Sequence, residues 1–126
     1  MRELKFRVWD KYRRYMSDDF GYLIDTRGDL WFFNRVILER QDLSKFEITQ
    51  YTGLKDKNGK DIYEGDIVEI FDANLCCYVI SEISFKDGAF LAEDKLLFYF
   101  IYDGDSYCAK IKIIGNKFES PELLQN

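Results

Sequence analysis

The stretch from Gln50 to Val68, QYTGLKDKNGKDIYEGDIV, decides how this chain folds. Its Asn58-Gly59 pair is typical of a tight hairpin turn, because both residue types tolerate positive φ angles. After the turn, Gly65 permits a sharp bend, and the alternation that follows predicts a strand with Val68 and Ile70 on one face. These residues have architectural roles that need no ligand, although a binding loop stays an alternative because loops often carry function.

Working outward, alternation of apolar and charged residues predicts further half-buried strands. The alternating segments are Leu4–Trp9, Glu82–Lys86 and Lys110–Ile113. Turn residues predict the connections between strands at Arg27-Gly28-Asp29, Asp87-Gly88, Asp103-Gly104-Asp105 and Gly115-Asn116. Aromatic residues make up 17% of the chain and favour strands over helices. Many short strands at this spacing predict a small barrel or sandwich.

Helix signals are few. The segment Leu30–Leu43 follows neither a helical nor a strand period cleanly, so we expect a strand that leads into a short helix. Near the end, Ser120 precedes Pro121 and Glu122, a pattern that predicts one final helical turn over Pro121–Leu124.

Size and composition narrow the class of protein. A chain of 126 residues fits one domain, and 47% hydrophobic with 33% charged residues is typical of a globular protein. The longest apolar run, Leu96–Tyr102, is too short for a membrane helix, and the first residues do not resemble a signal peptide. We therefore expect a cytoplasmic protein with reduced cysteines, in which Cys76, Cys77 and Cys108 are small buried hydrophobic residues.

Several segments resemble known binding or catalytic motifs, but their residues do not match those motifs. Gly53–Lys60 has five residues between its glycines, and Asp61 stands where a phosphate-binding loop needs Ser or Thr. Asp56, Asn58 and Asp61 do not match a calcium loop, and Asp103 with Asp105 is more typical of a turn than of an acid-base or metal pair. The chain also contains no histidine. We expect no catalytic residue, no metal and no cofactor, and therefore no enzyme.

One cluster suggests contact with nucleic acid. Lys5, Arg7, Trp9, Lys11 and Arg13 fall at alternate positions, and on an extended strand they would share one face. Cations with an aromatic residue in such a row suit a phosphate chain. A turn at Asp10-Lys11 would break the row, and the net charge of −5 argues against strong nonspecific binding.

Charge is divided unevenly along the chain. Residues 1–60 hold 13 Lys/Arg against 10 Asp/Glu, whereas residues 61–126 hold 5 against 13. The acidic, aromatic-rich second half suggests a surface that meets a protein partner, either a host protein or a second copy of the chain. The alternative is that the aromatic residues fill the core.

Three segments together resemble the YopX family of small proteins from bacteriophages and prophages. They are RELKFRVWDK at Arg2–Lys11, the stretch Gln50–Val68, and IIGNKFESPELL at Ile113–Leu124. The resemblance implies a β-rich fold whose second half is an SH3-like barrel, and it brings no catalytic residue to this chain. Residues 17–45 and 72–108 carry no recognised motif.

These observations lead to one expectation about fold and two about function. We expect a mainly β (α+β) single domain over residues 1–126, with an N-terminal β-hairpin region at 1–60 and an SH3-like barrel at 61–126. We expect a phage or prophage accessory protein that binds a protein, itself or a host factor, without catalysis or membrane attachment. The alternative is a nucleic-acid-associated protein that uses Lys5, Arg7, Trp9, Lys11 and Arg13.

Overall fold

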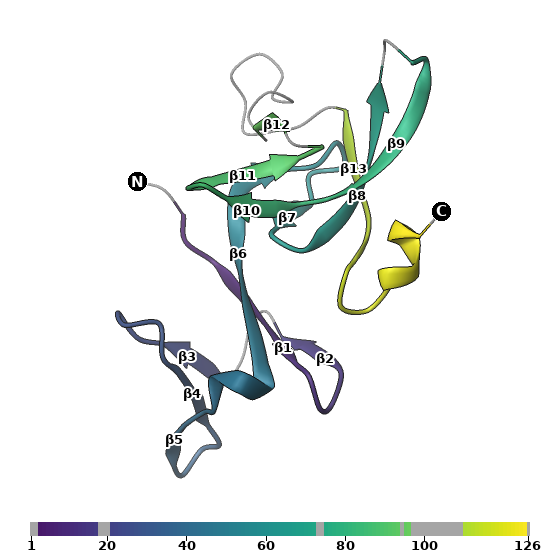
Figure 1. Cartoon of the computed structure of the whole chain (residues 1–126). Helices are drawn as coiled ribbons and strands as arrows, with labels where there is room; N and C mark the ends of the chain where they lie inside the picture. Colours follow the sequence, from purple (N-terminus) through teal and green to yellow (C-terminus); the bar gives the residue numbers. More distant parts are fainter. Residues whose placement is uncertain (1–2, 18–20, 73–74, 94, 97–109, 126) are drawn as a thin grey trace. The chain divides into compact units, whose positions relative to one another are not determined.

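The computed structural model describes residues 3–17, 21–72, 75–93, 95–96 and 110–125 of the chain. In this part the regular structure is almost entirely β, and the helical segments are single 3₁₀ turns (Figure 1). The expected mainly β class is therefore confirmed. In chain order, the elements are β1 (Phe6–Asp10), β2 (Tyr15–Ser17), β3 (Tyr22–Ile24), β4 (Leu30–Phe33), β5 (Leu38–Arg40), η1 (Leu43–Lys45), β6 (Phe46–Lys55), β7 (Asp61–Tyr63), β8 (Asp66–Asp72), β9 (Cys77–Glu82), β10 (Ser84–Lys86), β11 (Ala89–Ala92), β12 (Lys95–Leu96), β13 (Ile111–Asn116) and η3 (Pro121–Leu124).

The chain forms two compact units. One unit is the continuous segment Phe6–Thr49, called the small unit here, and the other combines Met1–Lys5 with Gln50–Asn126 and is called the large unit. Strand β6 crosses the boundary, so its first four residues belong to the small unit and the rest to the large unit. The single-domain organisation with a division at residue 60 stays a prediction.

In the small unit, β1 and β2 pair antiparallel, and β3, β4 and β5 form a three-stranded antiparallel sheet in that order. The turn after β1 is fixed by the Asp10 carboxylate, which accepts hydrogen bonds from the backbone N–H groups of Tyr12 and Arg13, both at 3.0 Å. Gly28 adopts a φ of 85° in the turn between β3 and β4. The Arg27-Gly28-Asp29 turn was correctly predicted, and Leu30 after it is fully buried.

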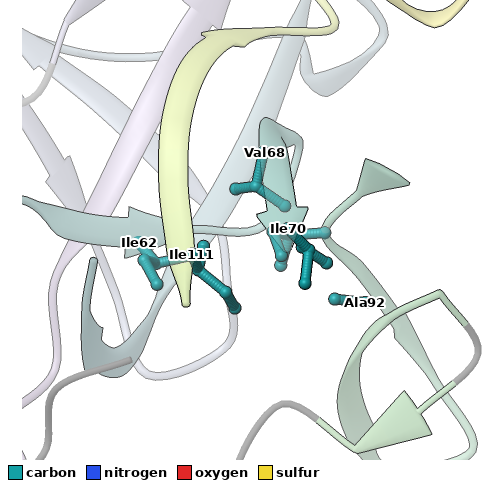
Figure 2. Packing of buried hydrophobic residues seen from close by; sticks show 6 residues of the cluster. Ile62, Val68, Ile70, Ala92 and Ile111 are labelled. Atoms are coloured by element: carbon teal, nitrogen blue, oxygen red, sulfur yellow. The ribbon is translucent and has the colours of Figure 1, made fainter. Parts of the chain in front are cut away.

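In the large unit, β8 is the middle strand of the antiparallel β13-β8-β9 sheet, which is curled into a half-barrel (Figure 1). A second antiparallel sheet has the order β10-β11-β12. Aliphatic side chains fill the core between them, and Figure 2 shows how those from β7, β8, β11 and β13 gather there. The buried residues of this cluster are Ile62, Val68, Ile70, Ile83, Ala92 and Ile111.

The predicted connection at Asn58-Gly59 is present, with a φ of 80° at Gly59, and it joins β6 to β7. A different arrangement occurs at Gly115-Asn116, where the sequence predicted a turn. Both residues lie in β13, at a register irregularity opposite β8, and the Asn116 side chain caps the turn that follows by accepting from the Phe118 and Glu119 N–H groups. An asparagine that accepts from the next residues marks the start of a turn rather than its centre.

Two further predictions were wrong in detail. Leu30–Leu43 contains the two strands β4 and β5 before the 3₁₀ turn η1, instead of one strand and a helix. Cys76 and Cys77 are exposed rather than buried, because they lie where the chain enters β9, an outer strand of its sheet among the described residues. Cys108 and the Asp103-Gly104-Asp105 turn lie outside the described residues. The final turn Pro121–Leu124 is confirmed, although Ser120 makes no side-chain cap.

Candidate functional site

The structure does not arrange the five predicted nucleic-acid residues as one exposed row. Trp9 is buried, with 5% of its surface exposed, and Arg7 is half-buried. Lys11 follows the turn at Asp10, where its ammonium donates to the Ser44 carbonyl at 3.1 Å and lies 3.5 Å from the Glu47 carboxylate. The alternation predicted from the sequence ends at this turn, since Asp10 redirects the chain after Trp9.

Lys5 lies in the large unit and is held by acidic and aromatic neighbours. Its ammonium forms ion pairs with Glu3 and Asp61 and lies 4.4 Å from the centre of the Tyr51 ring. Lys55 binds the other oxygen of the Asp61 carboxylate at 2.5 Å. Lys5 therefore anchors the segment before β1 and already has anionic partners.

The pairing around Asp61 makes the large unit sensitive to acid. Partial burial raises the pKa of Asp61, but the hydrogen bonds and positive charges of Lys5 and Lys55 outweigh it, so the net pKa is lowered. A carboxyl with a lower pKa in the folded than in the unfolded chain stabilises the fold above the unfolded value, which is about 4. This contribution is lost as the pH falls through the folded-state pKa.

We therefore expect Asp61→Asn to be less stable than the wild type at pH 7, and the difference to shrink below about pH 4. Urea unfolding of both proteins at pH 7, 4 and 2.5 measures it. Glu122→Asn, which changes an exposed carboxylate, is the control and should track the wild type. A difference in stability that is the same at all three pH values would contradict this account.

The small unit contains an open cleft of about 410 Å³ beside β3 and the β1–β2 turn. Its floor is aromatic, because the Tyr22 ring packs against Phe32 at 5.1 Å and against Phe46 at 5.8 Å between centroids. Arg13, whose side chain is 84% exposed, and Lys45 supply positive charge at its rim. Burial raises the pKa of the Tyr22 phenol, and the negative charge of Asp10 adds to this effect, so the phenol is a neutral donor. The cleft thus offers aromatic surface with charges of both signs.

The opposite side of the β3-β4-β5 sheet is apolar and open. Leu30, which is fully buried, and Phe32 lie on the side of β4 that carries the cleft, so the side chains that alternate with them point to the other side. We call this second side the outer face. Its residues, placed by strand register, are Leu23, Trp31, Phe33, Leu38 and Arg40.

Exposure on the outer face is high for apolar side chains. Leu23 is 55% exposed, and Phe33 and Leu38 are each 49% exposed. A shallow groove of about 360 Å³ runs along this side between Leu23, Trp31 and Leu38. Exposed apolar side chains that lie together, rather than singly, mark interaction sites on soluble domains.

The polar groups on the outer face already have partners. The Trp31 indole N–H donates to the Asp25 carboxylate at 3.2 Å, and the Arg40 guanidinium donates to Asp29 at 3.1 Å. Hydrogen bonds from the Asp29 N–H and from the Trp31 indole lower the pKa of Asp25, which keeps this carboxylate charged. The indole therefore presents its carbon edge to solvent with its polar atom satisfied.

The candidate calcium residues have other roles. Asp56 is 1% exposed, and its carboxylate accepts hydrogen bonds from the N–H groups of Asn58, Lys60 and Ile113. Asp61 is occupied by its two lysines. Within the described ranges, no three cysteine or carboxylate side chains lie together as metal ligands. The Asp56 carboxylate thus joins the turn to β13.

Sequence reasoning missed the outer face because residues 17–45 match no known motif. One signal was available: the run Leu-Trp-Phe-Phe at Leu30–Phe33 is apolar at every position. A strand with apolar residues on both faces needs cover on both faces. Its neighbours β3 and β5 are short edge strands that cannot supply that cover.

Comparison with known proteins identifies the family. The model of the YopX protein family matches residues 5–125, almost the whole chain. The chain belongs to the YopX family. The SPbeta prophage-derived uncharacterized protein YopX of Bacillus subtilis (strain 168) is 31% identical over 130 residues, which cover 95% of each chain.

Two crystal structures are similar to this YopX chain over almost its whole length. Protein EF1440 from Enterococcus faecalis matches with a TM-score of 0.67 and 30% identity, over 99% of this chain and 100% of that one. Protein yopX from Bacillus subtilis matches with a TM-score of 0.70 and 25% identity, over the same shares.

In the described part of this chain, no helix has the length and apolarity needed to span a membrane.

Proposed function

We propose that this chain is a phage- or prophage-encoded accessory protein that acts in the bacterial cytoplasm as a non-enzymatic binding module. Its partners are proteins, either a second copy or a host factor. The observation that carries this proposal is the outer face, where Leu23, Phe33 and Leu38 are about half exposed on one side of one sheet. Such a surface favours contact with another protein because burial of apolar side chains drives association.

The fold proposed for this module is an SH3-like barrel at residues 61–126, with an N-terminal β-hairpin region before it. The curled β13-β8-β9 sheet and the antiparallel pairing of β1 with β2 support this description. A small barrel that carries short sheets and turns is a common frame for binding surfaces.

The test compares two variants with the same chemical change. Leu38→Lys places an ammonium on the outer face, and Phe85→Lys makes the corresponding change at a side chain of the large unit that is 52% exposed. Each protein is tagged, and its binding to host lysate and to untagged wild type is measured. We expect Leu38→Lys to weaken binding at least tenfold and Phe85→Lys to leave it unchanged. Equal binding by all three proteins would contradict a role for the outer face.

A second candidate function is contact with single-stranded nucleic acid at the cleft of the small unit. The aromatic floor of Tyr22, Phe32 and Phe46 with Arg13 and Lys45 at the rim supports it, because bases stack on aromatic rings and phosphates pair with cations. A labelled oligonucleotide should then be retarded at about 50 mM salt and released as salt rises. Arg13→Glu should abolish the retardation, and absence of any retardation by the wild type excludes this function.

A further inference from the structure

We infer that the outer face of the small unit is covered by a second copy of the same chain, in a weak twofold homodimer. The inference rests on the proposed function and names the partner. Three observations on the outer face carry it: its apolar surface, its local charge pattern and its size.

The apolar surface is ready to be buried. Leu23, Phe33 and Leu38 expose about half of their surface. The polar atoms beside them would keep their partners on burial, since Trp31 is bound to Asp25 and Arg40 to Asp29. Contact here would therefore leave no polar group of these pairs without a hydrogen bond.

The charge distribution favours an identical partner. Residues 6–49 contain 8 Lys/Arg and 8 Asp/Glu, a net charge of zero, whereas residues 1–5 and 50–126 contain 10 against 15 and carry the whole charge of −5. Two copies repel when charged regions meet, so the neutral unit is the part of the chain where like chains approach without this cost. A strongly basic or acidic protein has no net charge to match on this unit as a whole.

The charges near the outer face also alternate in sign. Asp25, Arg27, Asp29 and Arg40 lie on or next to the β3–β4 turn and the facing strand β5. In a twofold contact the same patch meets itself, so each acidic group finds basic groups of the partner within the same patch. This local pattern is complementary to itself and gives the contact a polar rim around an apolar centre.

The size of the face sets the strength of the dimer. Leu23, Phe33 and Leu38, each about half exposed, give each copy only a small apolar area to bury. A stable interface buries about 800 Å² on each partner. The outer face is smaller than this, so it forms only the centre of the contact, and the dimer is weak. A dissociation constant in the micromolar range follows from a contact of this kind.

Sedimentation equilibrium of the full chain between about 1 and 500 μM tests the inference. We expect the wild type to pass from monomer to dimer across this range and Leu38→Lys to dissociate at least ten times more readily. Phe85→Lys, the matched control, should behave as the wild type. A wild type that stays monomeric at 500 μM overturns the inference, and so does a dimer broken by Phe85→Lys but not by Leu38→Lys.

A spectroscopic measurement keeps the test independent of how the variant folds. The sequence has two tryptophans, Trp9, which is buried, and Trp31, which is on the outer face. Dilution of the wild type should shift the emission of Trp31 to longer wavelength as the dimer dissociates, and Trp31→Phe should remove this shift. Emission that does not change with concentration overturns the dimer. If the wild type is monomeric and Leu38→Lys loses binding to a host protein, the dimer is excluded but the proposed function is not.

Discussion

Asp56→Ala is expected to lower the free energy of unfolding by about 3–4 kcal/mol. The carboxylate is 1% exposed and accepts three backbone hydrogen bonds, from Asn58 and Lys60 at 2.9 Å and from Ile113 at 3.1 Å. Hydrogen bonds to a charged group contribute more than neutral ones, and alanine leaves the partly buried Ile113 N–H of β13 without this acceptor. Urea unfolding at pH 7 measures the loss.

Asp56→Asn separates the contribution of the two hydrogen bonds within the turn from that of the hydrogen bond to β13. The amide oxygen can still accept from the turn, but the amide NH₂ then meets the Ile113 N–H, where two donors face each other. We expect a loss between that of the alanine variant and zero. Glu122→Ala, an exposed carboxylate, is the control and should change stability by less than about 0.5 kcal/mol. If Asp56→Asn is as stable as the wild type, the bond to β13 contributes nothing.

Ile70→Ala is expected to cost about 2–4 kcal/mol. Ile70 is 2% exposed on β8 and packs in the core with Ile62, Val68 and Ile111 (Figure 2). Truncation removes three buried carbon atoms and leaves a cavity in the core of the large unit. The close-packed neighbours of Ile70 cannot move far enough to fill this cavity completely.

The matched control is Ile80→Ala, on the neighbouring strand β9. Ile80 is 47% exposed, so the same truncation should cost less than about 1 kcal/mol. Chemical unfolding of the two variants gives the comparison directly. Equal losses in both would show that burial in this cluster does not dominate the stability of the large unit.

The parts of the fold that local chemistry controls were predictable from the sequence. Asn58-Gly59 makes its turn, and Gly65 makes its bend with a φ of 90°, where an added Cβ would lie 3.0 Å from the Phe118 ring. Val68 and Ile70 share one face of β8 and lie in the core cluster, as their alternation predicted, although Ile67 on the other face is buried as well. Positive φ angles and period-2 patterns are set by a few neighbouring residues, so they can be read without the rest of the chain.

The features that depend on distant residues were not predictable. Period 2 placed Trp9 on the same face as Lys5 and Arg7, but the structure buries Trp9 in the small unit. The same period placed Phe85 with Ile83, yet Phe85 is 52% exposed on the edge strand β10, where it packs against Phe90. Alternation predicts that two faces differ, but only the neighbouring strands decide which face is covered.

The site was harder to predict than the fold for a related reason. The outer face is assembled from β3, β4 and β5, which pair across turns that the sequence marks only in part. The sequence spacing argued against Asp56 as a calcium ligand, but it did not predict that the carboxylate accepts from the Ile113 N–H, because Ile113 lies 57 residues further along the chain. A carboxylate that accepts from backbone N–H groups and one that binds an ion can occur in the same sequence pattern. Only the tertiary structure distinguishes the two roles.

The division of the large unit into two chain segments has a consequence for synthesis on the ribosome. The small unit is continuous and emerges early, so it can fold while translation proceeds. The large unit needs the residues before β1, because the Lys5 carbonyl accepts a hydrogen bond from the Tyr51 N–H. It also needs β13, which is the last of its strands to be translated. Until β13 arrives, one edge of β8 has no partner, and a nascent chain stalled at that point would present an open, apolar strand to chaperones and proteases.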